Sequence, residues 1–187
     1  VLSYEVKMRL GHIAYRVKDR NKAADFFCKT MFYRLDPDIP NGFDIQFEDG
    51  TNAKCLVLVP FERVNRNLKF KEYINLTPWK SVEYHMAPEI FVSDGSDSSI
   101  VANWVNKNGP GIHHIAYETI NVLEMMKHWQ SNGIEFASEK PLVCKDLIQV
   151  FTKPHPITGV IYELIQRKSF GFCKDNVKNL MNSTKKF

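Results

Sequence analysis

His12-Ile13-Ala14-Tyr15 recurs in this chain as His114-Ile115-Ala116-Tyr117. The two copies start about 100 residues apart, which leaves room for a whole folding unit rather than one turn of a solenoid. Each copy lies in a stretch that alternates between two faces with the period of a β-strand. A run typical of an amphipathic helix follows each, at residues 19–31 and 122–130. The chain is therefore predicted to contain a duplicated module.

Further strands follow the helix in each copy. In the first, residues 43–48 and 54–59 alternate on either side of Asp49-Gly50, which predicts a hairpin, and strand character returns at residues 82–93. Residues 61–80 have no counterpart in the second copy and are predicted to be an insertion that covers or rims a site. In the second copy, strands are expected at residues 134–136, 147–152 and 160–167.

The predicted fold class is α+β, with two tandem βαβββ modules forming one cupped mixed sheet around a metal site. We expect a single domain over residues 1–187, with module one at about 8–95 and module two at about 111–168. A linker helix is expected at about 98–108. A C-terminal helix is expected at about 172–184, where apolar side chains recur at helical spacing.

Composition favours an ordinary globular protein. The 187 residues are 44% hydrophobic and 25% charged, and the net charge of +4 is not gathered into a basic, aromatic-rich nucleic-acid surface. No apolar run approaches a membrane span and no signal-like segment opens the chain, so a cytoplasmic location is the expectation. The four cysteines lie singly, without a C-x-x-C pair, which favours reduced thiols. They are Cys28, Cys55, Cys144 and Cys173.

The residues that head the two copies indicate a metal site. His12 and His114 occupy equivalent places on equivalent strands, so they are suited to bind one ion. Glu163 is the one acid in the last apolar strand of module two, and a buried charge needs a partner or a cation. Glu89 is the acid on the last strand of module one. This set of two imidazoles and two carboxylates predicts one divalent ion: Zn, Ni, Co, Mn or Fe.

Simpler interpretations exist for each of these residues. A histidine on a strand face is often a hydrogen-bonded core residue, and the alternative for Glu163 is a salt bridge to a Lys or Arg from a neighbouring strand. Glu89 is also compatible with a strand-edge acid in water. The remaining histidines are expected to be structural or at the surface. They are His85, His113, His128 and His155.

Three stretches resemble the vicinal oxygen chelate superfamily, which includes glyoxalase I, methylmalonyl-CoA epimerase, extradiol dioxygenases and 4-hydroxyphenylpyruvate dioxygenase. They are G-H-I-A-Y-R-V at residues 11–17, the segment from S-S-I-V to H-H-I-A-Y-E at residues 98–118, and T-G-V-I-Y-E-L-I-Q-R at residues 158–167. These stretches look most like methylmalonyl-CoA epimerase. The resemblance implies the same four metal ligands, His12, Glu89, His114 and Glu163, with Glu163 or Glu89 also moving a proton.

The resemblance also indicates substrate-binding residues. The place of the epimerase's catalytic glutamate falls at or near Cys55, so the usual base is absent. The segment L-I-Q-V-F-T-K-P and the C-terminal helix are similar to the end of 4-hydroxyphenylpyruvate dioxygenase, where the glutamine matching Gln149 lies near the substrate. In that relative, Fe(II) is held by two histidines and one carboxylate. Arg16, on the same strand face as His12, is the third predicted substrate-binding residue.

Three functions are open at this point. The first is a metal-dependent lyase, isomerase or epimerase of the glyoxalase type that stabilises an enediolate or enolate. The second is a non-haem Fe(II) dioxygenase acting on a keto acid or catechol, favoured if Glu89 is not a ligand. The third is a metal-free small-molecule binding protein of the same fold. The expected partner is a small-molecule substrate, with neither nucleic acid nor membrane, and a homodimer is possible because the superfamily is often dimeric.

Overall fold

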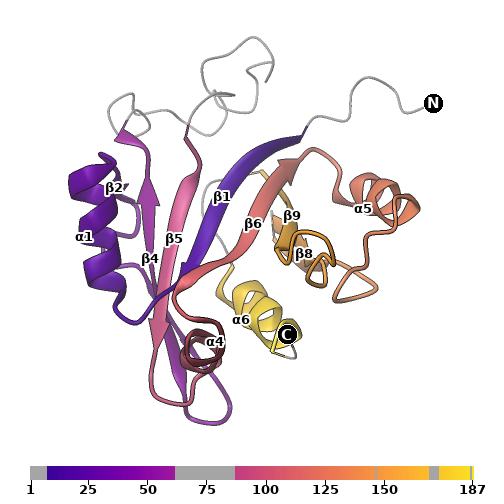
Figure 1. The fold of residues 1–187 in the computed structure, drawn as a ribbon. Helices are drawn as coiled ribbons and strands as arrows, with labels where there is room; N and C mark the ends of the chain where they lie inside the picture. The colour runs from indigo at the N-terminus through magenta and orange to yellow at the C-terminus, as the bar shows by residue number, and fades with distance from the viewer. Residues whose placement is uncertain (1–7, 62–86, 146, 169–172, 186) are drawn as a thin grey trace. The chain divides into compact units, whose positions relative to one another are not determined.

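The computed structural model describes residues 8–61, 87–145, 147–168, 173–185 and 187 (Figure 1). The chain divides into two compact units. We call His12–His113 the N-terminal unit, and Val1–Gly11 together with His114–Phe187 the C-terminal unit. Each unit contains one of the two repeated tetrapeptides.

The N-terminal unit is built on a mixed sheet. Its strands lie in the order β2-β4-β5-β1, with β3 paired to β4. The pair β1 and β5 is parallel, and the other pairs are antiparallel. The elements are β1 (Met8–Arg16, which enters the unit at His12), α1 (Arg20–Thr30), β2 (Arg34–Leu35), β3 (Phe43–Gln46), β4 (Asn52–Val59), β5 (Glu89–Gly95) and α4 (Ile100–Asn108). The predicted βαβββ order is therefore present, with the two-residue β2 as an addition.

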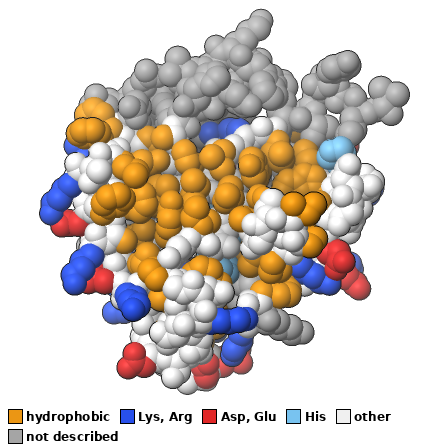
Figure 2. All heavy atoms as spheres, viewed as in Figure 1, with side chains coloured by type: hydrophobic (Ala, Val, Ile, Leu, Met, Phe, Trp, Pro, Cys, Tyr) orange, Lys and Arg blue, Asp and Glu red, His pale blue; other side chains and the backbone are white. Residues whose placement is uncertain are grey.

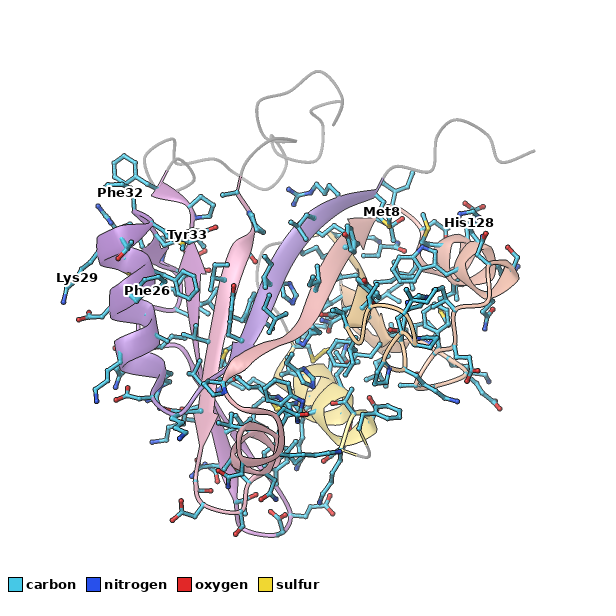
Figure 3. The ribbon with its side chains drawn as sticks, in the orientation of Figure 1. Met8, Phe26, Lys29, Phe32, Tyr33 and His128 are labelled. Atoms are coloured by element: carbon cyan, nitrogen blue, oxygen red, sulfur yellow. A yellow bond between two sulfur atoms is a disulfide. The ribbon has the colours of Figure 1, made fainter. Side chains whose placement is uncertain are left out.

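Helix α1 begins where the sequence predicts. The Asp19 carboxylate accepts hydrogen bonds from the backbone N–H groups of Asn21 and Lys22, both at 3.0 Å, and so caps the helix. Ala24 and Phe27 are buried against the strands. Tyr33, just after the helix, points toward the strands and donates a hydrogen bond to the carbonyl of Pro88 at 2.7 Å, whereas Lys29 points away (Figure 3). Burial of this apolar stripe fixes the helix on its sheet.

The predicted hairpin is also present. Strands β3 and β4 pair antiparallel, with Phe43 opposite Cys55 and Gln46 opposite Asn52. Gly50 has a φ of +80° in the turn, a conformation that glycine adopts without strain. Figure 2 shows charged side chains along the α1 edge of the N-terminal unit and hydrophobic side chains beside them.

The C-terminal unit repeats the plan with strand order β6-β9-β8-β7. Strands β6 and β9 are parallel, and the other pairs are antiparallel. The elements are β6 (Gly111–Thr119, which enters the unit at His114), α5 (Val122–Ser131), β7 (Leu142–Cys144), β8 (Leu147–Phe151), β9 (Ile161–Arg167) and α6 (Lys174–Ser183). The α+β class and the mixed βαβββ pattern are thus confirmed within each unit.

Helices α5 and α6 pack on this second sheet through the expected apolar positions. Val122, Met125 and Met126 of α5 are buried with strand residues Val150 and Leu164. Leu180 of α6 is 3% exposed and packs in a cluster with Phe151 and Ile161. The predicted C-terminal helix is therefore docked on its own unit.

Two sequence expectations for the C-terminal unit are wrong. Residues 134–136 do not form a strand but make one isolated bridge, Phe136 to Thr152. Instead, the edge strand is β7, whose three residues are too few for a periodic pattern. Cys144 and Cys173 are not reduced thiols, because they form a disulfide that joins β7 to the start of α6. A pairing between residues separated by 29 positions leaves no local signature in the sequence.

Some expectations fall on segments outside the described residues. They are the insertion beyond Phe61, the strand residues 82–86, and His85. Among the described helices, none is both long enough and apolar enough to cross a membrane.

Candidate metal-binding site

The parallel strand pair of each unit holds the predicted ligand residues in register. In the N-terminal unit, His12 on β1 is beside Glu89 on β5, and Phe91 is beside Ala14. In the C-terminal unit, His114 on β6 is beside Ile161 on β9, and Glu163 is two residues further along, beside Ala116. Neighbours in parallel register share a sheet face, so each histidine lies on the same face as its acid.

This register separates the two glutamates. Aligning His12 with His114 places Phe91 at the position of Glu163, and places Glu89 at the position of Ile161. Glu89 and Glu163 are therefore on equivalent strands but two residues apart. A shift of two residues keeps the face and moves the carboxylate by about 6–7 Å along the strand. The N-terminal unit thus offers an aromatic ring where the C-terminal unit offers a carboxylate.

Glu163 is placed by a chain of three contacts within the C-terminal unit. Its Oε2 lies 3.4 Å from Nε2 of His114, and its Oε1 accepts a hydrogen bond from Nε2 of Gln149 at 2.6 Å. Oε1 of Gln149 in turn accepts a hydrogen bond from Nδ2 of Asn176 at 3.3 Å. Glu163 is only 1% exposed, so its carboxylate is shielded from water and surrounded by these polar side chains.

Aromatic rings pack on both histidines. The ring centroids of His114 and Phe151, on β8, are 4.7 Å apart, and those of His12 and Phe91 are 4.5 Å apart. These contacts restrict the orientation of each imidazole. A fixed imidazole beside a buried carboxylate suits a divalent ion, and His114 and Glu163 both belong to a group of side chains that could hold one.

Cys55 and Arg16 lie together in one row across the N-terminal sheet. Ser93 on β5 is beside Cys55 on one side and beside Arg16 on the other. Cys55 is buried, and this burial raises the pKa of its thiol far above the usual range, so the thiol stays protonated. The protonated thiol of Cys55 is therefore not available as a base.

Two features of the C-terminal unit were not predicted. Asn176 is 4% exposed, and its only sequence signal is helical spacing, since it lies four residues before the docked Leu180. Glu118 is bound by both Arg9 and Arg167. Burial raises the pKa of the Glu118 carboxyl, but the attraction of Arg167 and Arg9 outweighs burial and leaves that pKa below its usual value.

His113 fits the structural interpretation. Its side chain is buried, and its ring packs nearly perpendicular to that of Trp104 on α4, with 5.5 Å between the ring centroids. His128 lies on α5, at the labelled position in Figure 3.

Two βαβββ units in one chain, each with a parallel pair of first and last strands, define the class of protein: a tandem-module fold of the glyoxalase type. The chain belongs to the Glyoxalase/Bleomycin resistance protein/Dioxygenase superfamily, whose sequence profile matches residues 11–151. The resemblance seen in the sequence is thereby confirmed.

Two curated relatives are 4-hydroxyphenylpyruvate dioxygenases. The one from Danio rerio is 26% identical over 172 residues, covering 71% of this chain and 43% of the relative. The one from Xenopus tropicalis is 27% identical over 169 residues, covering 70% and 43%. The chain thus spans less than half the length of these curated relatives.

Solved structures share the fold. A mutant of 4-hydroxymandelate synthase from Streptomyces coelicolor matches with a TM-score of 0.70 at 15% identity, covering 95% of this chain and 53% of that one. Methylmalonyl-CoA epimerase from Mycobacterium tuberculosis matches with a TM-score of 0.55 at 19% identity, covering 89% and 93%. At these identities the likeness concerns the fold alone.

Proposed function

We propose that this chain is a metal-dependent enzyme in which His12, His114 and Glu163 hold one divalent ion, and that its reaction is an oxygen-dependent one on a keto acid. The observation that carries the proposal is the strand register, which gives the N-terminal unit Phe91 where the C-terminal unit has Glu163. A site built from equivalent positions of the two units then has two histidines and one carboxylate.

The side chains around Glu163 are compatible with a metal ion. Its buried carboxylate lies beside the imidazole of His114 and accepts a hydrogen bond from the amide of Gln149, and a bound divalent cation would compensate its charge. Neutral imidazole is the form that binds metals. His12 heads the same tetrapeptide on the corresponding strand, which supports it as the third ligand.

Three protein ligands of this kind suit a non-haem Fe(II) centre that keeps open positions. When bound, such an ion would supply Lewis acidity and redox chemistry toward a substrate that offers two adjacent oxygens. The protein's own part is to hold the carboxylate: Gln149 donates to Glu163, and Asn176 donates to Gln149. These hydrogen bonds keep one carboxylate oxygen engaged and so orient the other toward His114. The 4-hydroxyphenylpyruvate dioxygenases found as relatives support the keto-acid substrate class.

A lyase or epimerase reaction is the second candidate. Glu89 lies beside His12 on β5 and is 8% exposed, so a buried carboxylate is present on that strand as well. The epimerase from Mycobacterium tuberculosis also matches this chain over nearly the whole length of both. If Glu89 were a fourth ligand, proton transfer next to a carbonyl would be favoured over oxygen chemistry.

Metal binding by single variants separates the two candidates. The purified protein is stripped with a chelator and titrated with Fe(II), Mn, Ni and Zn, by calorimetry or competition with a coloured chelator. His114→Ala and Glu163→Ala are expected to lose binding, and His12→Ala likewise. Glu89→Gln is the matched control, a buried strand acid whose replacement is expected to leave the affinity unchanged.

Activity then identifies the reaction. Oxygen uptake by the Fe(II)-loaded protein is measured with aromatic keto acids, beside turnover of methylmalonyl-CoA and the methylglyoxal–glutathione adduct. Oxygen uptake that Glu163→Ala abolishes supports the proposal. Loss of metal in Glu89→Gln, together with turnover of either thioester or adduct without oxygen, would instead establish the second candidate.

A further inference from the structure

A disulfide closes the junction between strand β7 and helix α6 of the C-terminal unit. Cys144 is the last residue of β7, and Cys173 is the residue immediately before α6. Both cysteines are half-buried, and the residues beside them in the chain, Val143 and Lys174, are exposed. A small thiol can therefore approach this bond from solvent.

The first turn of α6 is held by this disulfide and by Asn176. Nδ2 of Asn176 donates hydrogen bonds to the carbonyl of Leu142 at 3.5 Å and to Oε1 of Gln149 at 3.3 Å. In the part of the chain that the structure describes, the Cys173 side chain makes no capping hydrogen bond to the helix. The buried apolar residue of α6, Leu180, lies about two turns beyond Cys173. Opening the disulfide would therefore loosen the first turn while Leu180 keeps the rest of the helix docked.

This first turn is connected to the proposed metal ligand. Gln149 accepts the hydrogen bond from Asn176 and donates one to Oε1 of Glu163 at 2.6 Å. Leu142, whose carbonyl also binds Asn176, is the β7 residue paired with Gln149. The three polar side chains, Asn176, Gln149 and Glu163, are buried. A change at the disulfide thus reaches Glu163 through two buried side-chain hydrogen bonds.

We propose that the Cys144–Cys173 disulfide is a thiol-sensitive switch that controls how firmly Glu163 is oriented. With the bond closed, α6 presents Asn176 to Gln149. With the bond open, the first turn frays, Gln149 loses Asn176, and the carboxylate of Glu163 is less firmly oriented. The effect on metal binding rests on the proposed function, whereas the loosening of the first turn rests on the C-terminal unit alone.

The bond opens by thiol–disulfide exchange with a small dithiol. A thiolate of the dithiol attacks Sγ of Cys144 and forms a mixed disulfide, while Cys173 leaves as a thiolate. A helix N-terminus stabilises a thiolate, which makes Cys173 the better leaving group. The second thiol of the dithiol then displaces Cys144. The dithiol is thereby oxidised to its cyclic disulfide, and the two cysteines gain two electrons and two protons; a small disulfide reverses the reaction.

Backbone amide exchange and metal binding of the full chain test the switch. The protein is incubated with millimolar dithiothreitol without denaturant, and the dithiol is removed under nitrogen before metal is added. A chromogenic thiol reagent should then find the thiols of Cys144 and Cys173. The amide of Val177 donates to the carbonyl of Cys173 at 3.0 Å, and its hydrogen–deuterium exchange, followed by NMR, should become about tenfold faster. Chelator competition should show metal affinity about two- to tenfold weaker, the range for one neutral hydrogen bond.

Three variants separate the switch from a general loss of stability. Cys144→Ser should resemble the reduced wild type and should not respond to the dithiol. Cys28→Ser is the matched control, because Cys28 is a free, half-buried cysteine on α1 of the N-terminal unit, and it should keep both responses. Asn176→Leu removes the link between α6 and Gln149, so the dithiol should no longer change its metal affinity.

The proposal is overturned if the disulfide stays closed in millimolar dithiol, which would make it a permanent structural cross-link. It is also overturned if reduction leaves either Val177 exchange or metal affinity unchanged, or if Asn176→Leu keeps the full effect of the dithiol on metal affinity. If the oxidised wild type binds no metal, the proposed function fails, and the exchange of Val177 alone decides the switch: faster exchange after reduction supports it, and equal exchange overturns it.

Discussion

Replacing Gln149 with leucine removes the amide that holds Glu163 while keeping a side chain of similar size. The hydrogen bond is 2.6 Å long, is fully buried, and has a carboxylate as acceptor. Hydrogen bonds to charged groups contribute about 1.5–3 kcal/mol, and leaving the buried acceptor without its donor carries a similar penalty. Because 1.4 kcal/mol corresponds to about a tenfold change in affinity, metal binding should weaken about 10- to 100-fold.

The assay is competition with a chelator whose affinity for the same ion is known, beside urea unfolding of the metal-free protein. Asn176→Leu serves as a graded control, because Asn176 reaches Glu163 only through Gln149, by a longer bond of 3.3 Å. Its effect on metal affinity should be clearly smaller. If Gln149→Leu unfolds like wild type and binds metal within about threefold of it, Gln149 does not support the ligand and the reasoning fails.

Two further predictions concern stability. Reduction of the Cys144–Cys173 disulfide, or replacement of Cys144 with serine, opens a loop of 29 positions. The free energy of unfolding should then fall by about 3–4 kcal/mol, measured by urea titration with and without reductant. Equal urea midpoints under the two conditions would exclude a stabilising role for the disulfide. Glu118 has a lowered pKa in the folded state, so its contribution is complete above its unfolded value of 4.5 and is lost as the pH falls through the folded value. Acid titration of Glu118→Gln should therefore show a lower stability at neutral pH and a smaller further loss below about pH 4 than wild type, and parallel curves would contradict the ion pairs with Arg9 and Arg167.

The helix, hairpin and strands that have a strong local signal in the sequence are present in the structure as predicted. Asp19 predicted the start of α1 because a carboxylate before a helix satisfies free backbone N–H groups, a purely local interaction. The alternation around Asp49-Gly50 predicted the β3–β4 hairpin for the same reason. The repeated His-Ile-Ala-Tyr predicted two equivalent strands, and the structure has them in β1 and β6.

Only part of the candidate site could be predicted from the sequence. Glu163 stood out as the one acid in an apolar strand, and it is buried as expected. Glu89 stood out in the same way, but the alignment of β5 against β1 places it two residues away from the equivalent position. Strand register is set by pairing between segments nearly 80 residues apart, so no window of the sequence contains it.

The sequence by itself predicted the duplication, the βαβββ order, and the kinds of side chain that could hold a metal. These features could be predicted because periodicity, helix caps and repeats are visible in the order of residues along the chain. Only the folded chain brings Gln149 and Asn176 to Glu163, joins Cys144 to Cys173, and leaves Arg16 buried beside Trp104. These outcomes depend on which distant segments pack together, since hydrogen bonding and burial act through space and not along the chain.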